Sequence, residues 1–302
     1  MNRKWYEHRA VVGILALLAV VVLVGFAVFW FSDPRELVGR PLSPPSTDHL
    51  LGTNGQGQDV LRRTLAGGAL TLSVALMVAS LVVILGTWIG VLAAMAEGFW
   101  AQFLETFINM TLVIPGLPLT IVIAAYAPPG PMTMVLVLSL TGWAWTARVM
   151  KAQAMSLRSR DFVLGSKLAG DSIFKIVRVD MLPNLLPIMA ASFIGACNYA
   201  LGAQVGLEFL GLGDLSMVTW GTNLYWAQND GALFTGAWWT YVPSGLGLAI
   251  IGFILTWLNR TLDEIANPSL GDRRWWLKRL VGNTKLESGV TPVVKDSSHA
   301  SS

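Results

Sequence analysis

Long apolar runs, separated by short polar or basic segments, dominate the chain. A helix needs about 20 apolar residues to cross the roughly 30 Å of hydrocarbon in a bilayer. Six runs are long enough, at residues 10–31, 69–96, 103–126, 131–149, 184–206 and 241–259. The pattern therefore predicts an all-α polytopic membrane protein with six transmembrane helices.

The composition supports this interpretation. Of the 302 residues, 54% are hydrophobic and only 13% are charged, whereas a soluble domain carries about 25% charged residues. The formal net charge of +3 is no argument for nucleic acid, because a basic excess in a membrane protein usually reports its orientation. We therefore expect membrane lipid, and no nucleic acid, among the partners.

The first apolar run has two interpretations. It follows a basic start and ends in Phe29, Trp30 and Phe31, which are typical of a membrane interface. A cleaved signal peptide has a shorter apolar core and a cleavage site of small residues. We predict an uncleaved spanning helix, with the signal peptide as the alternative.

The basic residues fall mostly on one side of the predicted membrane. Three Lys or Arg precede the first run, seven lie from Arg148 to Arg178, and seven follow the sixth run, so these groups hold 17 of the 21. Six crossings place all three groups on the same side, which the positive-inside rule assigns to the cytoplasm. Both termini are therefore expected in the cytoplasm.

Two apolar runs carry features that leave alternatives open. Gly86 and Gly90 form a small-xxx-small pair, which fits either packing inside the chain or a subunit contact. In the third run, Pro115 predicts a kink, which suits a helix that lines a path. Asn109, in the same run, fits an interhelical hydrogen bond or, as the alternative, a substrate contact.

The segment 206–240 contains no Lys or Arg and is too short and too interrupted by glycine to span a bilayer. We expect it to be a re-entrant or surface-lying piece that closes the outer mouth, with a plain interfacial helix as the alternative. The glycines between 52 and 57 indicate a tight turn before an interfacial helix, because they do not fit the Gly-x-Gly-x-x-Gly pattern of a phosphate-binding loop.

Sequence signals for an energy source or a catalytic centre are missing. The chain has no Gly-x-x-x-x-Gly-Lys-[Ser/Thr] loop for ATP. It has a single cysteine, Cys197, and three histidines far apart, so no Cys/His metal cluster is predicted. No run holds the paired acids that proton coupling requires. We expect no enzyme and no bound cofactor or metal. Transport powered by another protein, and a scaffold that recruits a soluble partner, both stay open.

Short motifs across residues 45–270 resemble one family. Gly170, followed after eleven residues by Leu182-Pro183, matches the back half of the EAA loop of bacterial ABC importer permeases. The wider pattern is similar to the second permease subunit of the dipeptide/oligopeptide/nickel family. Its further matching pieces are Leu51-Gly52-Thr53, Gly57, Asp59-Val60-Leu61, Pro115-Gly116, Leu140-Thr141-Gly142-Trp143, Ala147-Arg148, Ser156-Leu157-Arg158, Asp161-Phe162-Val163, Asn184, Leu207 to Gly213, Trp220-Gly221 and Asn267-Pro268.

The chain also departs from the family pattern. Leu164-Gly165-Ser166 stands where the family has Glu-Ala-Ala, and Asn109 stands where the family has an acidic residue in the third run. The missing acid in the loop removes a standard docking charge. We therefore expect docking of the ATPase to depend on shape and apolar contact more than on that charge.

The resemblance implies a type I ABC importer permease fold with a cytoplasmic coupling helix, in the inner (cytoplasmic) membrane. The implied partners are a second homologous permease subunit, two ATPase subunits that bind ATP and Mg²⁺, and an extracytoplasmic substrate-binding protein. Di- or oligopeptides are the expected cargo, with oligosaccharides and metal chelates as alternatives. The expected division is a tail and first helix at 1–31, an external segment at 32–68, a permease core at 69–262 that contains the coupling loop 150–183, and a cytoplasmic tail at 263–302 that is disordered toward its end.

Two sets of candidate site residues follow. The stretch 162–176 is expected to form a short coupling helix with apolar side chains for a groove on the ATPase and basic residues that steer the encounter, while Gly170 allows a tight turn or a close approach. The coupling candidates are Phe162, Gly165, Lys167, Leu168, Gly170, Asp171, Ile173, Phe174 and Pro183. The candidates for the translocation path are Asn109, Pro115, Asn198, Gln204 and Glu208.

Overall fold

The computed structural model describes residues 33–266, and the side chains of 263–266 are not described. The helix predicted at 10–31, the tail after 266 and the cytoplasmic position of both termini lie outside the described residues. Within these residues the structure is helical. The helices are α2 (Val60–Met95), α3 (Gly98–Val113), α4 (Gly116–Tyr126), α5 (Pro131–Arg158), α6 (Asp161–Leu168), α7 (Ile173–Lys175), α8 (Leu182–Phe209), α9 (Trp220–Asn229) and α10 (Val242–Ala266), with a π-helical stretch η1 (Ile176–Met181) and a 3₁₀ turn η2 (Trp238–Thr240).

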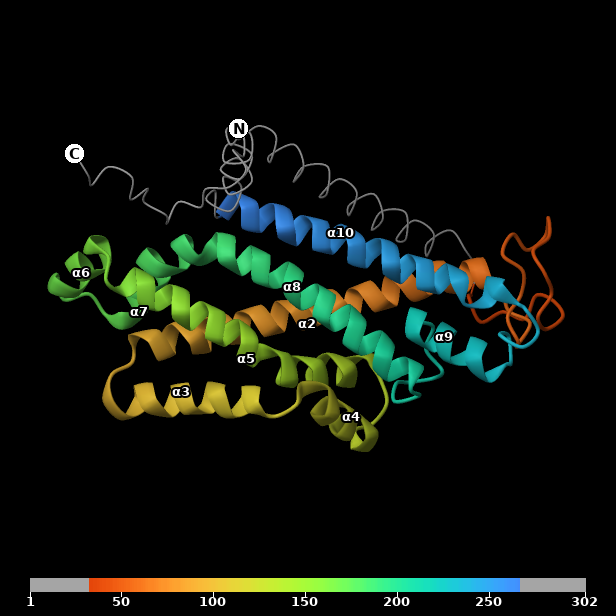
Figure 1. Ribbon diagram of the computed structural model, residues 1–302, viewed down its shortest axis with the longest axis horizontal. Helices are drawn as coiled ribbons and strands as arrows, with labels where there is room; N and C mark the ends of the chain where they lie inside the picture. Colours follow the sequence, from red (N-terminus) through yellow and green to blue (C-terminus); the bar gives the residue numbers. More distant parts are fainter. Residues whose placement is uncertain (1–32, 267–302) are drawn as a thin grey trace, which may run out of the picture.

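Several helices are long and apolar enough to cross a membrane. They are α2, α5, the continuous stretch Ile173–Phe209, and α10 up to Leu262, and α3 with α4 adds a fifth crossing if this bent pair is one span. Figure 1 shows α2, α5, α8 and α10 running along the long axis of the molecule. The all-α polytopic class is confirmed, while the count of six helices stays a prediction because its first member lies outside the described residues.

The third predicted run is broken rather than kinked. Helix α3 ends at Val113, α4 begins at Gly116, and the two axes differ by 82°. Pro115 explains the break, because it has no backbone N–H and pushes the residue before it out of the helical region. Ile114 accordingly has extended backbone angles, φ −71° and ψ 127°. The bend sends α4 away from the line of α3 (Figure 1).

The core of the bundle is the contact between α2 and α5. A Cβ added to Gly86 would lie 2.6 Å from Thr146 Cβ, and one added to Gly90 would lie 2.9 Å from Met150 Cβ. Only glycine allows the two backbones to come this close. The small-xxx-small pair is therefore an internal packing device and not a surface for another subunit.

At one end of the bundle, α9 fits between other helices. Trp220 is buried, and a Cβ on either Gly68 of α2 or Gly247 of α10 would come within 2.8 Å of its indole ring. The indole Nε1 donates a hydrogen bond of 2.8 Å to the Thr64 carbonyl. The segment predicted as re-entrant or interfacial thus contains a short helix that is packed into its own chain. We call this the α9 end.

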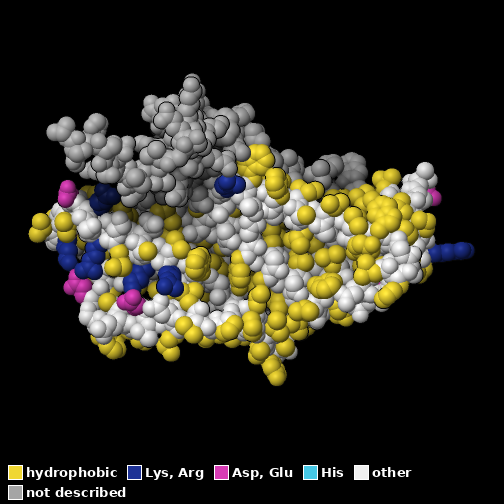
Figure 2. Space-filling view, in the orientation of Figure 1, with side chains coloured by type: hydrophobic (Ala, Val, Ile, Leu, Met, Phe, Trp, Pro, Cys, Tyr) yellow, Lys and Arg dark blue, Asp and Glu magenta, His cyan; other side chains and the backbone are white. Residues whose placement is uncertain are grey.

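The opposite end carries α6 and α7 and is called the α6 end. Figure 2 shows charged side chains gathered there, while the middle of this face is apolar or uncharged.

Helix α2 begins at Val60, earlier than the apolar run at 69, because Asp59 caps its first turn by accepting the Arg62 N–H. The predicted turn at the glycines 52–57 thus leads directly into α2.

Candidate functional site

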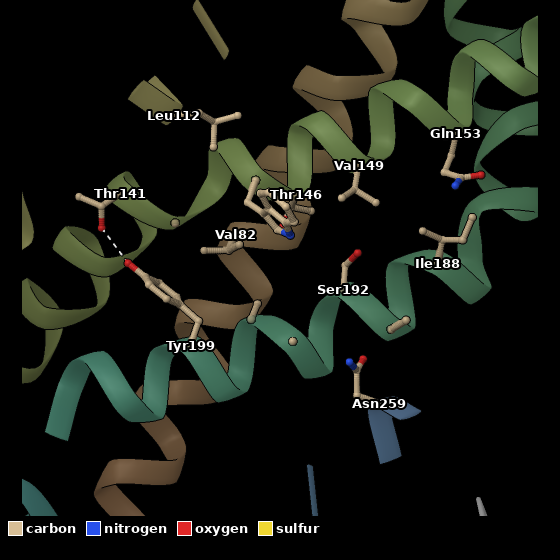
Figure 3. Close-up of a pocket in the computed structure, with 15 residues that line it drawn as sticks. Val82, Leu112, Thr141, Thr146, Val149, Gln153, Ile188, Ser192, Tyr199 and Asn259 are labelled. Atoms are coloured by element: carbon tan, nitrogen blue, oxygen red, sulfur yellow. Dashed lines mark hydrogen bonds between the residues drawn. The ribbon is translucent and has the colours of Figure 1, made fainter. Parts of the chain in front are cut away.

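A cavity of about 880 Å³ lies between α5 and α8 (Figure 3). Its wall is completed by one residue each from α2, α3 and α10. The lining residues are Val82, Leu112, Thr141, Gly142, Trp145, Thr146, Val149, Gln153, Ile188, Ala191, Ser192, Gly195, Ala196, Tyr199 and Asn259. A volume of this size is in the range of small-molecule sites, which hold drug-sized ligands.

The cavity faces of both helices follow the helical repeat. On α5, lining residues recur every fourth position from Thr141 to Gln153, and on α8 they recur every third or fourth position from Ile188 to Tyr199. Residues at these spacings share one face of a helix. Each helix thus presents one continuous stripe to the cavity.

The cavity wall mixes apolar and neutral polar side chains and contains no Asp, Glu, Lys, Arg or His among its lining residues. Hydroxyl groups come from threonine, serine and tyrosine, and amide groups come from Gln153 and Asn259 (Figure 3). Trp145 adds a large aromatic surface and is 67% exposed. Neutral donors and acceptors next to an aromatic ring can bind peptide-like groups without attracting one sign of charge.

The five residues predicted for the path lie elsewhere. Asn109 is exposed on α3, and Pro115 stands at the break before α4. Asn198 is on α8 but donates a hydrogen bond of 3.4 Å to Thr256 of α10. None of them lines the cavity. Their contact with cargo stays a prediction.

The other two path candidates, Gln204 and Glu208, are buried near the α9 end. Gln204 donates to the Glu208 carboxylate at 2.9 Å, and Thr219 donates to the same carboxylate at 2.6 Å. Thr219 is the N-cap of α9. Glu208 therefore joins α8 to α9, which is a structural role that the sequence did not indicate.

The predicted coupling segment lies at the α6 end. It forms two helices, α6 and α7, instead of the single helix predicted over 162–176. The break is at Gly170, which has φ +81°, a conformation that glycine adopts without strain. Its turn is closed by the Gly170 N–H on the Lys167 carbonyl and the Asp171 N–H on the Ser166 carbonyl. The expected tight turn is present.

This segment exposes apolar side chains. Leu168 is 89% exposed, and the other large apolar candidates, which are Phe162, Ile173 and Phe174, are also exposed. Val163 is the exception among its neighbours, because it is buried against the last turns of helix α2 and against η1. Phe174 still stacks on Trp88, with ring centroids 6.0 Å apart. Val163 and the Phe174 ring thus anchor the segment while other apolar side chains, such as Leu168, stay exposed.

Glu97 holds α6 in place from the corner between α2 and α3. Its carboxylate accepts from Arg158 at the end of α5 and from Lys167 of α6, at 2.5 and 3.3 Å. The hydrogen bond from Lys167, followed by the charges of Lys167 and Arg158, lowers the pKa of Glu97 below its usual value. The carboxylate is therefore ionised at neutral pH and links three elements.

A π-helical stretch connects the coupling segment to α8. In it, the Leu182 N–H bonds to the Val177 carbonyl, five residues back. Pro183 follows directly, and a proline ring clashes with the carbonyl four residues before it in a regular α-helix. The wider π turn relieves this clash. Pro183, a predicted coupling residue, thus shapes the joint between α7 and the cavity wall.

Comparison with known proteins agrees with this arrangement. Residues 86–264, more than half of the chain, match the family described as "binding-protein-dependent transport system inner membrane component". The chain belongs to this family. The matched range contains the segment α6–α7, η1 and all the cavity-lining residues except Val82. The predicted family resemblance is confirmed, and we refer to the protein below as the permease.

Curated relatives are permease proteins as well. The permease is 28% identical over 264 residues to the dipeptide transport system permease protein DppC of Bacillus subtilis, with 85% of this chain and 80% of the relative covered. It is 26% identical to the oligopeptide transport system permease protein OppC of Lactococcus lactis subsp. cremoris, with 88% and 92% covered. A putative peptide transport system permease protein of Brucella abortus is 29% identical, with 89% and 90% covered.

The sequence prediction missed the polar residues of the cavity wall. It singled out polar residues one at a time, whereas the useful signal is their repeat along a helix. Thr141, Trp145 and Gln153 lie on one stripe of α5, and Ser192 and Tyr199 lie on one stripe of α8. A search for polar and aromatic residues at this spacing within apolar runs would have found them.

Proposed function

We propose that the permease is the pore-forming subunit of an ATP-binding-cassette importer that moves di- or oligopeptides delivered by an extracytoplasmic binding protein. In this proposal a second, homologous permease subunit completes the path through the inner membrane. Two separate ATPase subunits bind ATP and Mg²⁺ and supply the energy, and the permease has no ATPase site of its own.

One observation carries the proposal, namely that the exposed segment α6–α7 continues into the cavity wall. The stretch Ile173–Phe209 is long enough for a single span and contains α7, η1 and α8. A displacement of α7 by a docked ATPase therefore acts on the helix that carries Ser192 and Tyr199. A scaffold that only recruits a partner has no need of this connection to a cavity.

The orientation follows from the basic residues. Those of the stretch from Arg148 to Arg178 belong to the end of α5, to the link between α5 and α6, and to α6, α7 and η1. The positive-inside rule then places the α6 end in the cytoplasm, where ATP is available. The α9 end faces the binding protein on the outside.

The peptide cargo is supported by the neutral cavity wall and by the relatives. Hydroxyl and amide groups match the donors and acceptors of peptide bonds, which every peptide carries whatever its side chains. Selection by a separate binding protein is compatible with a wall of this kind. The relatives named above are described as dipeptide and oligopeptide permeases.

The proposal is tested with Leu168→Asp in the complete transporter. Leu168 is almost fully exposed, so the change should leave the permease folded while it places a charge in the docking interface. We expect at least about a tenfold loss of affinity for the ATPase subunits, the loss of a central interface contact. Leu50→Asp, exposed at the α9 end, is the matched control and should bind the ATPases normally.

Two further measurements separate the alternatives. Gly170→Trp should abolish peptide-stimulated ATP hydrolysis, because its backbone conformation is strained for any residue with a side chain. Peptides, oligosaccharides and metal chelates are then compared as stimulators of hydrolysis by the unaltered transporter with its binding protein. ATPase binding without stimulation by any of them would favour a scaffold, and unchanged coupling in both variants would refute the assignment of α6–α7.

A further inference from the structure

One side-chain hydrogen bond joins helices α5 and α8 at the margin of the cavity. Tyr199 Oη lies 3.1 Å from Thr141 Oγ1 (Figure 3). Thr141 can donate its own hydroxyl hydrogen to the Val137 carbonyl at 3.0 Å, and its oxygen then accepts from Tyr199. Among residues 33–266, this is the only side-chain hydrogen bond between α5 and α8.

The ring of Tyr199 fills a space that Gly142 leaves open. A Cβ on Gly142 would lie 2.8 Å from Tyr199 Cε1 and 3.2 Å from Val82 Cγ2. The glycine therefore lets the ring enter between α2 and α5. A larger residue at 142 would push the ring, and α8 with it, away from α5.

A third helix reaches the same point. Thr120 of α4 is buried, and its Oγ1 lies 3.4 Å from Thr141 Oγ1. Helix α4 comes near because of the 82° break before it. The hydroxyls of Thr120, Thr141 and Tyr199 thus bring α4, α5 and α8 together.

The contact lies at one end of the cavity. Thr141 and Tyr199 are the lining residues nearest to the α9 end of their helices, whereas Gln153 and Ile188 are those nearest to the α6 end. At Gln153 and Ile188 no side-chain hydrogen bond joins the two helices in the described part of the chain. Among the described residues, a side-chain hydrogen bond therefore joins the two helices at the α9 end of the cavity alone, whereas Ala154 of α5 and Leu185 of α8 share a buried apolar cluster toward the α6 end.

We propose that Tyr199 and Thr141 form a latch that closes the external end of the translocation cavity and opens when α8 moves. This inference rests on the proposed function for the direction of transport. Tyr199 is a positioning residue that sets which side of the membrane the cavity meets. This latch is a single hydrogen bond, and its net contribution to the closed state is small. Its loss changes the ratio of closed to open molecules only about fivefold, which suits a switch.

The test measures from which side the cavity can be reached. In the complete transporter, the permease carries Cys197→Ala, which removes its one cysteine, and Ser192→Cys as a reporter on the cavity wall, and labelling is measured on the separated permease chain. A membrane-impermeant maleimide is applied to right-side-out and to inverted vesicles without nucleotide. We expect the parent to react from the cytoplasmic side. Tyr199→Phe should raise the rate from the external side about fivefold.

Two more variants make the test specific. Thr141→Val should act at least as strongly as Tyr199→Phe, because it leaves the tyrosine hydroxyl without its acceptor. Tyr126→Phe is the matched control, since Tyr126 is 89% exposed at the end of α4, and it should label like the parent. Thermal unfolding of every variant confirms that the fold is kept.

The outcomes separate the latch from the function. Equal external labelling of the parent, Tyr199→Phe and Thr141→Val overturns the latch, even if peptide transport is observed. Increased external labelling supports it, even if the cargo is not a peptide, because accessibility is measured without cargo. Labelling of the parent from the external side alone overturns both the latch and the orientation on which it rests.

Discussion

The two ends of the permease differ in where their polar side chains lie. At the α9 end, polar groups are buried and bond to one another: the Arg63 guanidinium donates to Asn223 at 3.0 Å, and Asn223 donates to Ser244 at 3.2 Å. At the α6 end, apolar side chains such as Leu168 are exposed. Charged groups there pair on the surface, as Lys175 does with Asp171 at 2.7 Å.

The difference shows how each end is held together. Buried polar groups that bond within the chain give a rigid arrangement, and we call this network at the α9 end the closed cap. The exposed apolar groups on the short helices of the α6 end fit the docking of an ATPase in the proposed function. The α9 end exposes apolar side chains as well, Phe234 among them. Substitutions in the cap should change stability, and substitutions on the proposed docking surface should change coupling.

The strongest test of the closed cap is Trp220→Ala. The indole fills the space between Gly68 and Gly247, and its removal leaves a cavity and loses the hydrogen bond to the Thr64 carbonyl. We expect a loss of about 3–5 kcal/mol in the free energy of unfolding, measured in detergent or lipid nanodiscs. Trp238→Ala, on a half-exposed indole, is the control. Equal losses of unfolding free energy in both variants would mean that the packing of Trp220 between α2 and α10 does not specifically stabilise this end.

A second test compares two glycines of the α6 end. A side chain would find open space at both Gly165 and Gly170, but only Gly170 has a positive φ. Gly170→Ala should therefore destabilise the α6–α7 turn by about 1–2 kcal/mol. Gly165→Ala, inside α6, should stabilise it by about 0.5–1 kcal/mol. Hydrogen exchange of the amides in α6 and α7 measures both changes, and the same sign in both variants would contradict the turn geometry.

The sequence was sufficient for the class of fold because apolar length alone identifies a spanning helix. It also located the turn at Gly170, since glycine adopts a positive φ without strain. It did not show that Pro115 breaks its helix, because the same proline can kink a helix that neighbours support. Nor did it assign Glu208, whose partner Thr219 is supplied by the packing of α9.

The cavity was harder to predict than the coupling segment. Coupling residues are contiguous in sequence, and their exposure follows from a short basic loop. The residues of the cavity come from several helices, and their meeting depends on how α2, α5 and α8 pack. The contact of Tyr199 with Gly142, for example, joins residues whose neighbours in sequence give no hint of it.

The two ends should also differ in their response to pH, beginning with Glu97 at the α6 end. The pKa of Glu97 is lowered, first by its hydrogen bond with Lys167. A carboxylate with a lowered pKa stabilises the fold above its unfolded pKa and loses this effect as the pH falls through the folded value. Amides of α6 should therefore exchange faster as the pH drops below the usual carboxyl range, after correction for intrinsic exchange. Glu97→Gln should abolish this pH dependence of the exchange rates. If the variant kept the pH dependence of the wild type, Glu97 would not be the residue that holds α6 in place.

Asp230, at the α9 end, should give the opposite sign and the smallest effect. Burial raises its pKa, while the Gly55 N–H and the charge of Arg63 act against the shift, and its Oδ2 is buried without a hydrogen-bond partner. The native state therefore holds this proton more tightly than the unfolded state, so stability falls as the pH rises from the usual aspartate value through the raised one. Asp230→Asn should remove that decline from the unfolding curve of the permease while Glu97→Gln leaves it in place. Asp230→Asn could instead lower the free energy of unfolding by the same amount at every pH. That result would mean that Asp230 stabilises the α9 end through its contacts, and that its titration does not cause the decline.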